Sequence, residues 1–383
     1  MTQSNVTFTN MVPAWVKKAQ QNPGSAPGNK ISEQELERLR ANPLVKERVQ
    51  DGFPHISSFN YDRYADHQEL DSLALSARGL YVNTQTREIV IRGYDKTPQL
   101  NQPGLASASL VEVIKNSTGP YTTSVIENGF LAMIGYDRVT DQLLFATKSI
   151  VDPDHHEWVF NHIKGTMTVE RFAALKTVVS ECQITLVFEV LEPETDPHII
   201  ENSRCKLVLL DGIRNSMQFE KVSRDQLEAI GVMFDFGCRV AGPSFKDKRA
   251  LTRFIVDASR NGYQYDDYGT KLEVEGLMIE DANGNMVKFK LPFYEMWRAC
   301  RLSMEMVSSQ KPKSRKPIPA DHLADPDVAA FVDWYKVQDP LPAKRNIIKA
   351  RNAYLAAHPD LPSPGYVGFS IKPEVEAEAL AVA

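Results

Sequence analysis

Hydrophobic and polar positions along the chain alternate between the two-residue period of β-strands and the helical period of about 3.6 residues. Residues 1–30 are rich in proline, glycine, asparagine and glutamine, and we expect them to form a mostly irregular lead-in. The first regular segment opens at a capping box, Ser32-Glu33-Gln34-Glu35. It predicts a helix with the apolar positions Leu36, Leu39, Val45 and Val49.

Strand patterns dominate the middle of the chain, where short apolar runs alternate with polar turns. We expect strands at 79–82, 88–93, 121–125, 130–136, 142–147, 184–191 and 206–210. We expect helices at 169–181, 224–233 and 244–261, the last capped by Ser244 and followed by Gly262. Two further strands, 272–279 and 286–291, flank the hairpin turn Asp-Ala-Asn-Gly-Asn at 281–285.

From residue 293 the pattern becomes helical. The segment 311–317, rich in lysine and proline, interrupts it and is a natural boundary. The period is helical again over 318–358, and we expect 359–383 to be loosely ordered. The pattern therefore predicts an α+β protein, with a mixed and mainly antiparallel domain at 1–305 and a small all-helical domain at 306–383.

Composition narrows the class of protein. A chain of 383 residues predicts two or three domains, or one elaborated domain with an appendage. With 43% hydrophobic and 24% charged residues it matches an ordinary globular protein, which excludes extended disorder and collagen-like chains. The formal net charge of −5 excludes a uniformly basic coat for nucleic acid, although it leaves room for a local basic cleft.

The ends and the cysteines indicate a reducing compartment. The N-terminus has no signal-peptide pattern and no apolar run is long enough to span a membrane, so we expect a cytoplasmic protein without a membrane partner. Cys182, Cys205, Cys238 and Cys300 have no Cys-x-x-Cys spacing and no histidine at ligand spacing. We interpret them as free, buried thiols rather than a zinc site or disulfides.

Several segments carry unusual chemistry. Residues 124–130 form a strand–turn–strand element with Gly129 at the bend, and Glu189 and Glu275 each place a carboxylate inside an apolar strand. Lys288 and Lys290 alternate so that both amines share one strand face. Buried carboxylates are costly unless they meet a metal, a cation or hydrogen-bond donors, so this set suits a metal-assisted phosphate site. The alternatives are a strand-edge ion pair for Glu189 and a solvated strand face for the lysines.

In order and spacing these segments resemble the covalent nucleotidyltransferases, and within them the ATP-dependent RNA ligases of the T4-type RNA ligase 1 group and the fungal tRNA ligases. The resemblance covers roughly residues 70–300. It rests on Leu-Val-Phe-Glu-Val-Leu-Glu-Pro-Glu-Thr-Asp-Pro-His at 186–198, Glu275-Gly276, Lys288-Phe289-Lys290, Ala-Arg-Gly-Leu at 77–80, Tyr94-Asp95-Lys96 and Ala-Thr-Lys-Ser at 146–149.

The resemblance implies a nucleotidyltransferase (ATP-grasp-like ligase) fold of mainly antiparallel sheets with flanking helices, followed by an all-helical C-terminal domain. It also implies an ATP-dependent RNA ligase that joins 3′-OH and 5′-phosphate ends through lysyl-AMP and RNA-adenylate intermediates. The implied cofactors are ATP and Mg²⁺ or Mn²⁺. The implied partner is RNA, with tRNA as one candidate, and we expect a monomer.

The resemblance also assigns roles to the cations. Arg78 and Lys96 would hold the β- and γ-phosphates of ATP, and Lys288 and Lys290 would contact the α-phosphate. Lys148 resembles an essential lysine on the phosphate side. Such cations neutralise the charge that builds on the leaving pyrophosphate.

The acidic residues and the turn complete the implied site. Glu189 would engage the ribose or the metal shell, and Glu275 a hydrated Mg²⁺. Glu127 and Gly129 belong to the turn that would contact the nucleotide.

The chain departs from the family at the nucleophile. The family's first motif is Lys-x-x-Gly, and aligning Gly129 with its glycine puts Ile126 at the lysine position. No lysine lies between Lys115 and Lys148, and isoleucine has no lone pair to form a phosphoramide. A substitution introduced to trap ATP, a natural pseudo-ligase and a different register all stay open. We predict a chain that binds ATP without adenylating itself; the alternative is an inactive pseudo-ligase that binds RNA or a nucleotide.

Three further sequence features concern the binding of RNA, of metal and of nucleotide phosphates. The basic clusters at 246–249, at 311–316 and at Lys344, Arg345, Lys349 and Arg351 are candidate RNA-backbone contacts, the last having the best claim because family members select RNA with a C-terminal helical domain. Residues 152–158 contain two histidines and are interpreted as a polar loop rather than a metal site. No P-loop sequence is present, so healing of RNA ends would need a separate protein.

Overall fold

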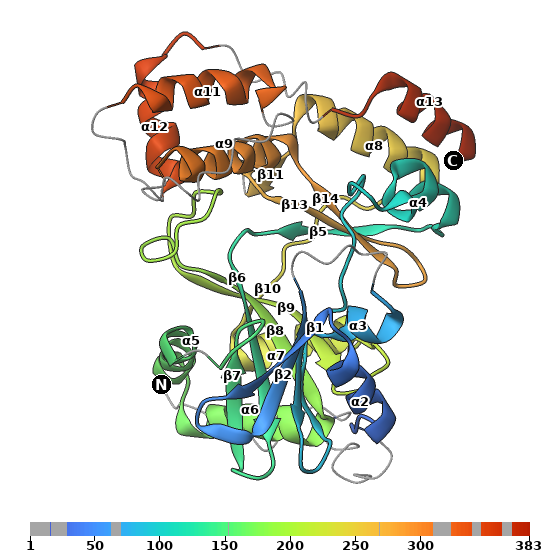
Figure 1. The fold of residues 1–383 in the computed structure, drawn as a ribbon, viewed down its shortest axis with the longest axis vertical. Coiled ribbons are helices and arrows are strands. Elements are labelled where there is room, and N and C mark those ends of the chain that lie inside the picture. Colours follow the sequence, from blue (N-terminus) through green and yellow to red (C-terminus); the bar gives the residue numbers. More distant parts are fainter. Residues whose placement is uncertain are drawn as a thin grey trace, which may run out of the picture. The chain divides into compact units, whose positions relative to one another are not determined.

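The computed structural model describes residues 16, 29–62, 70–151, 153–267, 269–308, 323–338, 346–361 and 370–383, with the backbone alone at 153–158, 160 and 267. The boundary segment 311–317 and nearly all of the lead-in at 1–30 lie outside these residues. By its internal contacts the chain divides into two units (Figure 1). Unit 1 comprises Met1–Lys96, Phe130–Val190 and Lys206–Arg239, and unit 2 comprises Thr97–Gly129, Leu191–Cys205 and Val240–Ala383. The division into 1–305 and 306–383 stays a prediction.

Unit 1 contains a four-stranded antiparallel sheet in the order β1-β2-β3-β4. Its strands are β1 (Val45–Gln50), β2 (Phe53–Tyr61), β3 (Arg78–Asn83) and β4 (Ile89–Arg92), and helices α2 (Glu33–Ala41) and α3 (Ser72–Ser76) pack with it. Leu36 and Leu39 of α2 are buried in the same core as Phe59 and Leu80 of the sheet. Each such burial contributes about 1.5–3 kcal/mol.

Helix α2 begins at the predicted capping box, where Ser32 Oγ accepts from the amide of Glu35 at 3.2 Å and the Glu35 carboxylate accepts from the Ser32 amide at 2.9 Å. The helix ends at Ala41, so the prediction that Val45 and Val49 belong to it is wrong. Both lie in β1, and Val49 is 56% exposed. The reason is the proline at position 43, which cannot continue a helix and disfavours helical backbone in the residue before it.

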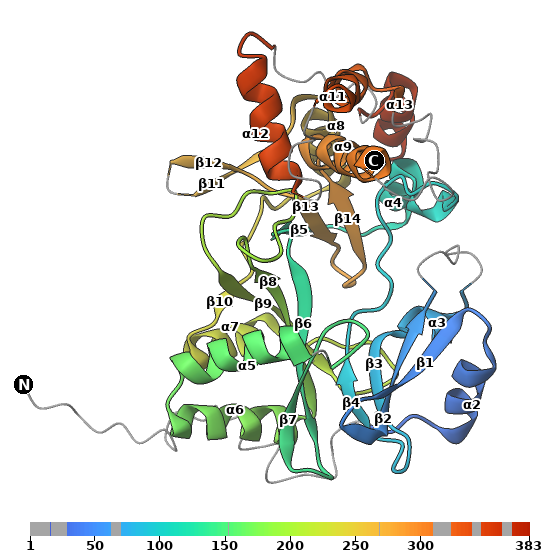
Figure 2. The same ribbon diagram turned by 60° about the vertical axis from the view of Figure 1, so that its left-hand side comes forward.

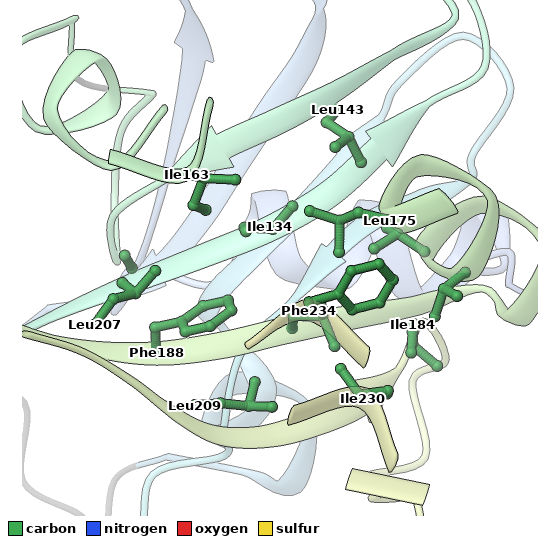
Figure 3. Packing of buried hydrophobic residues seen from close by; sticks show 14 of the residues in the cluster. Ile134, Leu143, Ile163, Leu175, Ile184, Phe188, Leu207, Leu209, Ile230 and Phe234 are labelled. Carbon is green, nitrogen blue, oxygen red and sulfur yellow. The ribbon is translucent and has the colours of Figure 1, made fainter. Parts of the chain in front are cut away.

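The second sheet of unit 1 has the order β10-β9-β8-β6-β7. β6 pairs antiparallel with β7 and β8, whereas β10 pairs parallel with β9. Its elements are β6 (Phe130–Asp137), β7 (Gln142–Ala146), β8 (Ile184–Leu191), β9 (Lys206–Arg214) and β10 (Gly237–Cys238), with helices α5 (Pro153–Thr166), α6 (Val169–Cys182) and α7 (Arg224–Phe234). Figure 3 shows Ile134 and Phe188 of the sheet with Leu175 of α6 and Ile230 of α7 in one apolar cluster.

Helix α5 corrects the interpretation of 152–158 as a polar loop, since the residues from Pro153 onward are helical. Proline suits the first turn of a helix, because the amide hydrogen that it lacks has no partner there.

Unit 2 contains the three-stranded antiparallel sheet β14-β13-β5 and the hairpin β11–β12. The elements are α4 (Leu110–Asn116), β5 (Thr122–Ile126), α8 (Lys248–Asn261), β11 (Gln264–Asp267), β12 (Thr270–Glu273), β13 (Gly276–Glu280) and β14 (Met286–Lys290), preceded by a short 3-10 helix, η3 (Ala106–Ala108). The turn at 281–285 is confirmed, because Asp281 Oδ1 accepts from the amides of Asn283 and Asn285 at 2.9 Å each.

Two boundaries in unit 2 differ from the prediction. The strand expected at 272–279 is divided between β12 and β13, since Val274 and Glu275 are both buried and break the alternation that a single half-exposed strand needs. Helix α8 begins at Lys248, and its cap is Asp247 rather than Ser244. The backbone of Phe245 instead exchanges two hydrogen bonds with Tyr121, at 2.8 and 2.9 Å, so the helix cannot start before it.

The C-terminal helices of unit 2 are α9 (Pro292–Ser308), α11 (Pro326–Lys336), α12 (Ile347–Ala357) and α13 (Pro373–Val382). Helix α13 shows that the expectation of loose order is wrong for 373–382, whereas residues 362–369 of the same segment lie outside the described residues. It packs against α4 and α8 (Figure 2), with Ile371 and Ala379 buried and with Arg260 of α8 paired with Glu376 at 2.5 Å. Its order therefore comes from tertiary contacts.

The α+β prediction, with mainly antiparallel sheets and helices toward the C-terminus, is confirmed. Within the described part of the chain, no helix combines the length and the apolar character needed to span a bilayer. All four cysteines are free, as expected, but only Cys182 and Cys300 are buried; Cys205 is exposed and Cys238 is half-buried. Cys205 directly precedes β9, and its thiol contacts the Glu192 carboxylate at 3.1 Å.

Candidate active site

Three predicted cations gather around one aromatic ring in unit 1. Arg78 begins β3, Lys96 follows β4 and Lys148 follows β7. The Nζ atoms of Lys96 and Lys148 lie 4.9 and 5.0 Å from the centroid of the Tyr61 ring. The positive charge of Arg78 acts on the Tyr61 hydroxyl and opposes the rise in the tyrosine pKa that burial causes. Tyr61 is a site residue that the sequence analysis missed, since an aromatic residue at the end of a strand carries no signal of its own.

The electrostatics of this group favour an anion. Burial, together with repulsion from Arg78 and Lys96, lowers the pKa of Lys148 to about 8. A multiply charged anion would relieve this repulsion, and phosphates are the anions that clustered lysine and arginine recognise.

Close backbone packing holds together the segments that carry Arg78 and Lys96. Gly79 has a φ of +69°, which glycine adopts without strain, and its carbonyl accepts from the Gly93 amide at 2.9 Å. A Cβ atom on Gly93 would overlap the carbonyl oxygen of Arg78. These two glycines therefore permit the close approach of the segments that carry Arg78 and Lys96.

The segment that carries Lys96 is further anchored by a buried network. The Tyr94 hydroxyl donates to Asp211 Oδ2 at 2.5 Å, and Arg239 Nη1 donates to the same oxygen at 3.2 Å. Burial and then the Asp211 charge raise the pKa of Tyr94, so the hydroxyl keeps its proton and acts as a donor. The Lys96 amide donates to the carbonyl of Leu75 at 3.1 Å.

Glu189 also lies in unit 1, on β8. The neighbouring positions Phe188 and Val190 are buried in the apolar cluster of Figure 3, so Glu189 faces the other side of the sheet. It is the half-buried position of a strand whose other residues are all buried. The pattern of β8 thus isolates one carboxylate on an apolar strand, as predicted.

The turn around the predicted nucleophile position lies in unit 2. Ile126 ends β5 opposite Gly276 of β13, and its carbonyl accepts from the Glu275 amide at 3.1 Å. Glu127 and Gly129 are half-buried in the following turn. The residue at position 126 is therefore bonded, through its backbone carbonyl, to the backbone amide of Glu275, whose side chain is the predicted metal-binding carboxylate.

Asn128 organises this turn, and the sequence analysis did not single it out. Its side chain is buried and its φ is +71°, a conformation that asparagine tolerates better than most residues. Its Oδ1 accepts from the amides of Ile199 and Ile200 at 2.9 Å each, and its Nδ2 donates to Glu275 Oε2. The Asn-Gly pair at a bend was a signal for its backbone conformation but not for these partners.

Glu275 and Lys290 form an ion pair, and each side chain is 11% exposed. The Lys290 Nζ atom also lies 4.9 Å from the centroid of the Tyr294 ring. Lys288 and Lys290 share the half-buried face of β14, as the alternation predicted, but the exposure of Lys290 rules out a fully solvated face. A carboxylate held by two donors from different elements is preorganised.

The described residues contain no group of three or more histidine, cysteine, aspartate or glutamate side chains that could hold a metal ion. Glu275 supplies a single carboxylate. Mg²⁺ commonly binds proteins through one or two carboxylates and takes its other ligands from water and substrate phosphates. The donor set therefore fits a cation that arrives with a nucleotide and does not fit a resident all-protein metal centre.

The predicted RNA contacts are partly corrected. Lys246, Arg249 and Lys349 are exposed, whereas Lys248 donates to the carbonyl of Lys115 at 2.9 Å. The prediction that Arg351 contacts RNA is wrong, because its side chain is only 8% exposed and is paired with Glu201 inside unit 2. Segment 311–316, Lys344 and Arg345 lie outside the described residues.

The predicted site residues thus form two groups. Unit 1 holds Arg78, Lys96, Lys148 and Glu189, and unit 2 holds Ile126, Glu127, Gly129, Glu275, Lys288 and Lys290. Contacts join Lys96 and Lys148 of the first group to Tyr61, on which the charge of Arg78 also acts. In the second group, contacts join Ile126, Glu275 and Lys290.

A family model described as RNA ligase matches residues 76–294, more than half of the chain. No curated protein matches the sequence. Solved structures that are similar include an archaeal ATP-dependent RNA ligase, at 9% identity and a TM-score of 0.47, covering 92% of this chain and 84% of that one. A putative ATP-dependent DNA ligase from Aquifex aeolicus has 11% identity and a TM-score of 0.45, covering 91% and 77%. A mutant Naegleria gruberi RNA ligase with ATP and Mn has 11% identity and a TM-score of 0.38, covering 53% and 57%.

Proposed function

The chain belongs to the RNA ligase family whose model matches residues 76–294, and from this premise we propose that it binds ATP without adenylating itself. The observation that carries the proposal is the position of Ile126. It ends β5 opposite Gly276, next to the Glu275–Lys290 ion pair. In this proposal a hydrocarbon side chain stands where the family has its lysine, and the charged residues around it are retained.

The residues of unit 1 supply the phosphate-binding half of the proposal. Arg78, Lys96 and Lys148 surround Tyr61, and we assign them to the triphosphate. Bound polyphosphate would relieve their mutual repulsion, and this relief contributes to the binding energy. We assign Glu189 to the ribose or to the metal shell.

In unit 2, Lys288 and Lys290 are assigned to the α-phosphate, Glu127 and Gly129 to the nucleotide, and Glu275 to a hydrated divalent cation. Mg²⁺ or Mn²⁺, when bound, supplies further neutralisation of phosphate charge. Asn128 and Lys290 hold the Glu275 carboxylate in place before any ligand arrives.

The family reaction has three steps. A lysine amine attacks the α-phosphorus of ATP and releases pyrophosphate; AMP then passes to the RNA 5′-phosphate; finally the 3′-OH attacks that phosphate and releases AMP. Ile126 has no lone pair, so the first bond cannot form at this position. The last step does not need the lysine as a nucleophile, and we therefore propose that the chain seals RNA that is already adenylated.

The wider assignments are proposals as well. We propose a cytoplasmic monomer that acts on RNA 3′-OH and 5′-phosphate ends, with tRNA as one candidate substrate, and whose residues 306–383 act as an all-helical substrate-selecting domain. The alternative, a pseudo-ligase that binds RNA or a nucleotide and seals nothing, is favoured by the same isoleucine. Sealing of 5′-adenylated RNA separates the two, because only the ligase joins the ends.

The decisive experiment incubates the chain, Ile126→Lys and the control Ile126→Met with ATP labelled on the α-phosphate and Mg²⁺. We expect covalent label on Ile126→Lys alone, and ATP binding by all three proteins in calorimetry. Methionine is unbranched, like the apolar part of the lysine side chain, but it has no amine. It therefore controls for the change in side-chain shape without supplying a nucleophile. Label on the unsubstituted chain would overturn the proposal, and silence of Ile126→Lys would overturn the register.

A further inference from the structure

Arg351 lies on α12 (Ile347–Ala357), far along the chain from every residue assigned to the reaction. Its guanidinium is buried, and it stands over the rings of Phe293 and Trp297 of α9 at 5.4 and 5.7 Å. Its Nη1 donates to the carbonyl of Ile199 at 3.0 Å and its Nη2 to Glu201 Oε2 at 3.3 Å. Figure 1 shows α12 beside α9, as their contacts require.

The same peptide of residues 199 and 200 is held from its other side by Asn128. Both of its amides donate to Asn128 Oδ1, while its Ile199 carbonyl accepts from Arg351. Asn128 in turn donates to Glu275, which is paired with Lys290. A continuous series of hydrogen bonds within unit 2 therefore runs from α12 through one peptide segment to the carboxylate beside Ile126.

Apolar packing alone does not account for an arginine here. Burying a guanidinium is costly. Glu201, the carboxylate that it hydrogen-bonds, is 59% exposed and so returns little Coulomb energy, and the charge of Glu273 contributes less than that of Glu201. A methionine would fill the space over Phe293 and Trp297 without this cost. The planar guanidinium of arginine supplies two directed donors, which methionine lacks, and one of them fixes the orientation of the Ile199 carbonyl.

We propose that Arg351 is a positioning residue of the ligase reaction: through the 199–200 peptide and Asn128 it orients the Glu275 carboxylate for the divalent cation that accompanies the nucleotide. The inference rests on the proposed function, since it assigns the cation to Glu275. It gives the C-terminal helices a role in the chemistry, in addition to any role in RNA selection. Partners that orient a metal-binding carboxylate typically change metal affinity about 10- to 100-fold when they are removed.

The test compares Arg351→Met, which keeps the apolar stem, and Arg351→Lys, which keeps the charge but loses the fork, with the exposed control Lys336→Met on α11. Hydrogen exchange is followed at the amides of Ile199, Ile200 and Glu275. ATP affinity is measured with Mg²⁺ and with EDTA. The full chain is used throughout.

We expect Arg351→Met to accelerate exchange at all three amides and to weaken ATP binding about tenfold in Mg²⁺, but less than about twofold in EDTA. The exchange rates and the ATP affinity of Arg351→Lys should lie between those of Arg351→Met and the unsubstituted chain. Those of Lys336→Met should match the unsubstituted chain. Adding Arg351→Met to Asn128→Ala should cost no further affinity, because both act through one series of bonds.

The proposal is overturned if Arg351→Met leaves the three amides unchanged, if affinity falls equally with and without Mg²⁺, or if the two substitutions multiply their effects. A merely structural arginine would lower the melting temperature and affect both ATP conditions alike. If the unsubstituted chain binds no ATP, the proposed function fails by itself. In that case, hydrogen exchange at the Glu275 amide in Arg351→Met still tests whether Arg351 stabilises the segment that carries the Glu275 carboxylate.

Discussion

We predict that the group of cations on Tyr61 makes ATP affinity depend on pH in a defined direction. The pKa of Lys148 is lowered to about 8 from 10.5 by burial and by the neighbouring cations Arg78 and Lys96. Its protonated form is therefore disfavoured in the unliganded protein, whose stability should rise as pH rises from about 8 toward 10.5. A bound triphosphate reverses the balance, because it favours the charged amine.

The magnitude follows from that pKa. If the bound state keeps Lys148 protonated up to a pH of about 9, then affinity scales with the protonated fraction of the unliganded protein, which falls about tenfold between pH ~7 and pH ~9. The dissociation constant should rise by this factor, equivalent to about 1.4 kcal/mol. Near pH ~8, binding should take up about half a proton.

Calorimetry in buffers of different ionisation enthalpy measures both quantities. Lys148→Arg is the matched control, because arginine stays protonated throughout this range and should remove the Lys148 contribution to the pH dependence. Lys148→Met should bind ATP more weakly at pH ~7 and also lose that contribution, leaving the titration of ATP itself. An affinity that is flat from pH ~7 to pH ~9, or a slope that survives in Lys148→Arg, would refute the reasoning.

Three further outcomes concern stability, each measured by urea denaturation. Asn128→Ala should cost about 2–4 kcal/mol, since it removes buried hydrogen bonds at a positive φ, whereas Asn128→Gly should cost less because glycine relieves the strain; equal losses would contradict a contribution from strain. Tyr94→Phe should cost about 1–2 kcal/mol by leaving Asp211 with fewer donors, and an unchanged midpoint would show that the hydroxyl bond contributes nothing net. Ile371→Ala should cost about 2–4 kcal/mol, whereas Val337→Ala, at an exposed position, should cost little; a negligible loss for Ile371→Ala would mean that the segment before α13 is not packed in solution.

Local signals in the sequence predicted much of the fold. The capping box at Ser32, the turn at 281–285 and the apolar strand 184–191 depend on residues within one element, and each is confirmed. The wrong extension of α2 past Ala41 overlooked a local signal, the proline at position 43. Other errors arose where a distant partner decided the outcome. Ser244 failed as a helix cap because Phe245 pairs with Tyr121, and 359–383 looked irregular although α13 packs against α4 and α8.

The candidate site likewise has features that the sequence determined and features that only the tertiary structure decided. The sequence by itself determined the order of the charged motifs, the single carboxylate of β8, the shared face of Lys288 and Lys290, and the hydrocarbon at position 126. Only the tertiary structure placed Tyr61 among three cations, Asn128 between Glu275 and the 199–200 peptide, and Arg351 on the Ile199 carbonyl. The physical reason is separation along the chain: Asn128 and Ile199 are 71 residues apart, Ile199 and Arg351 are 152 apart, and no periodicity encodes such pairs.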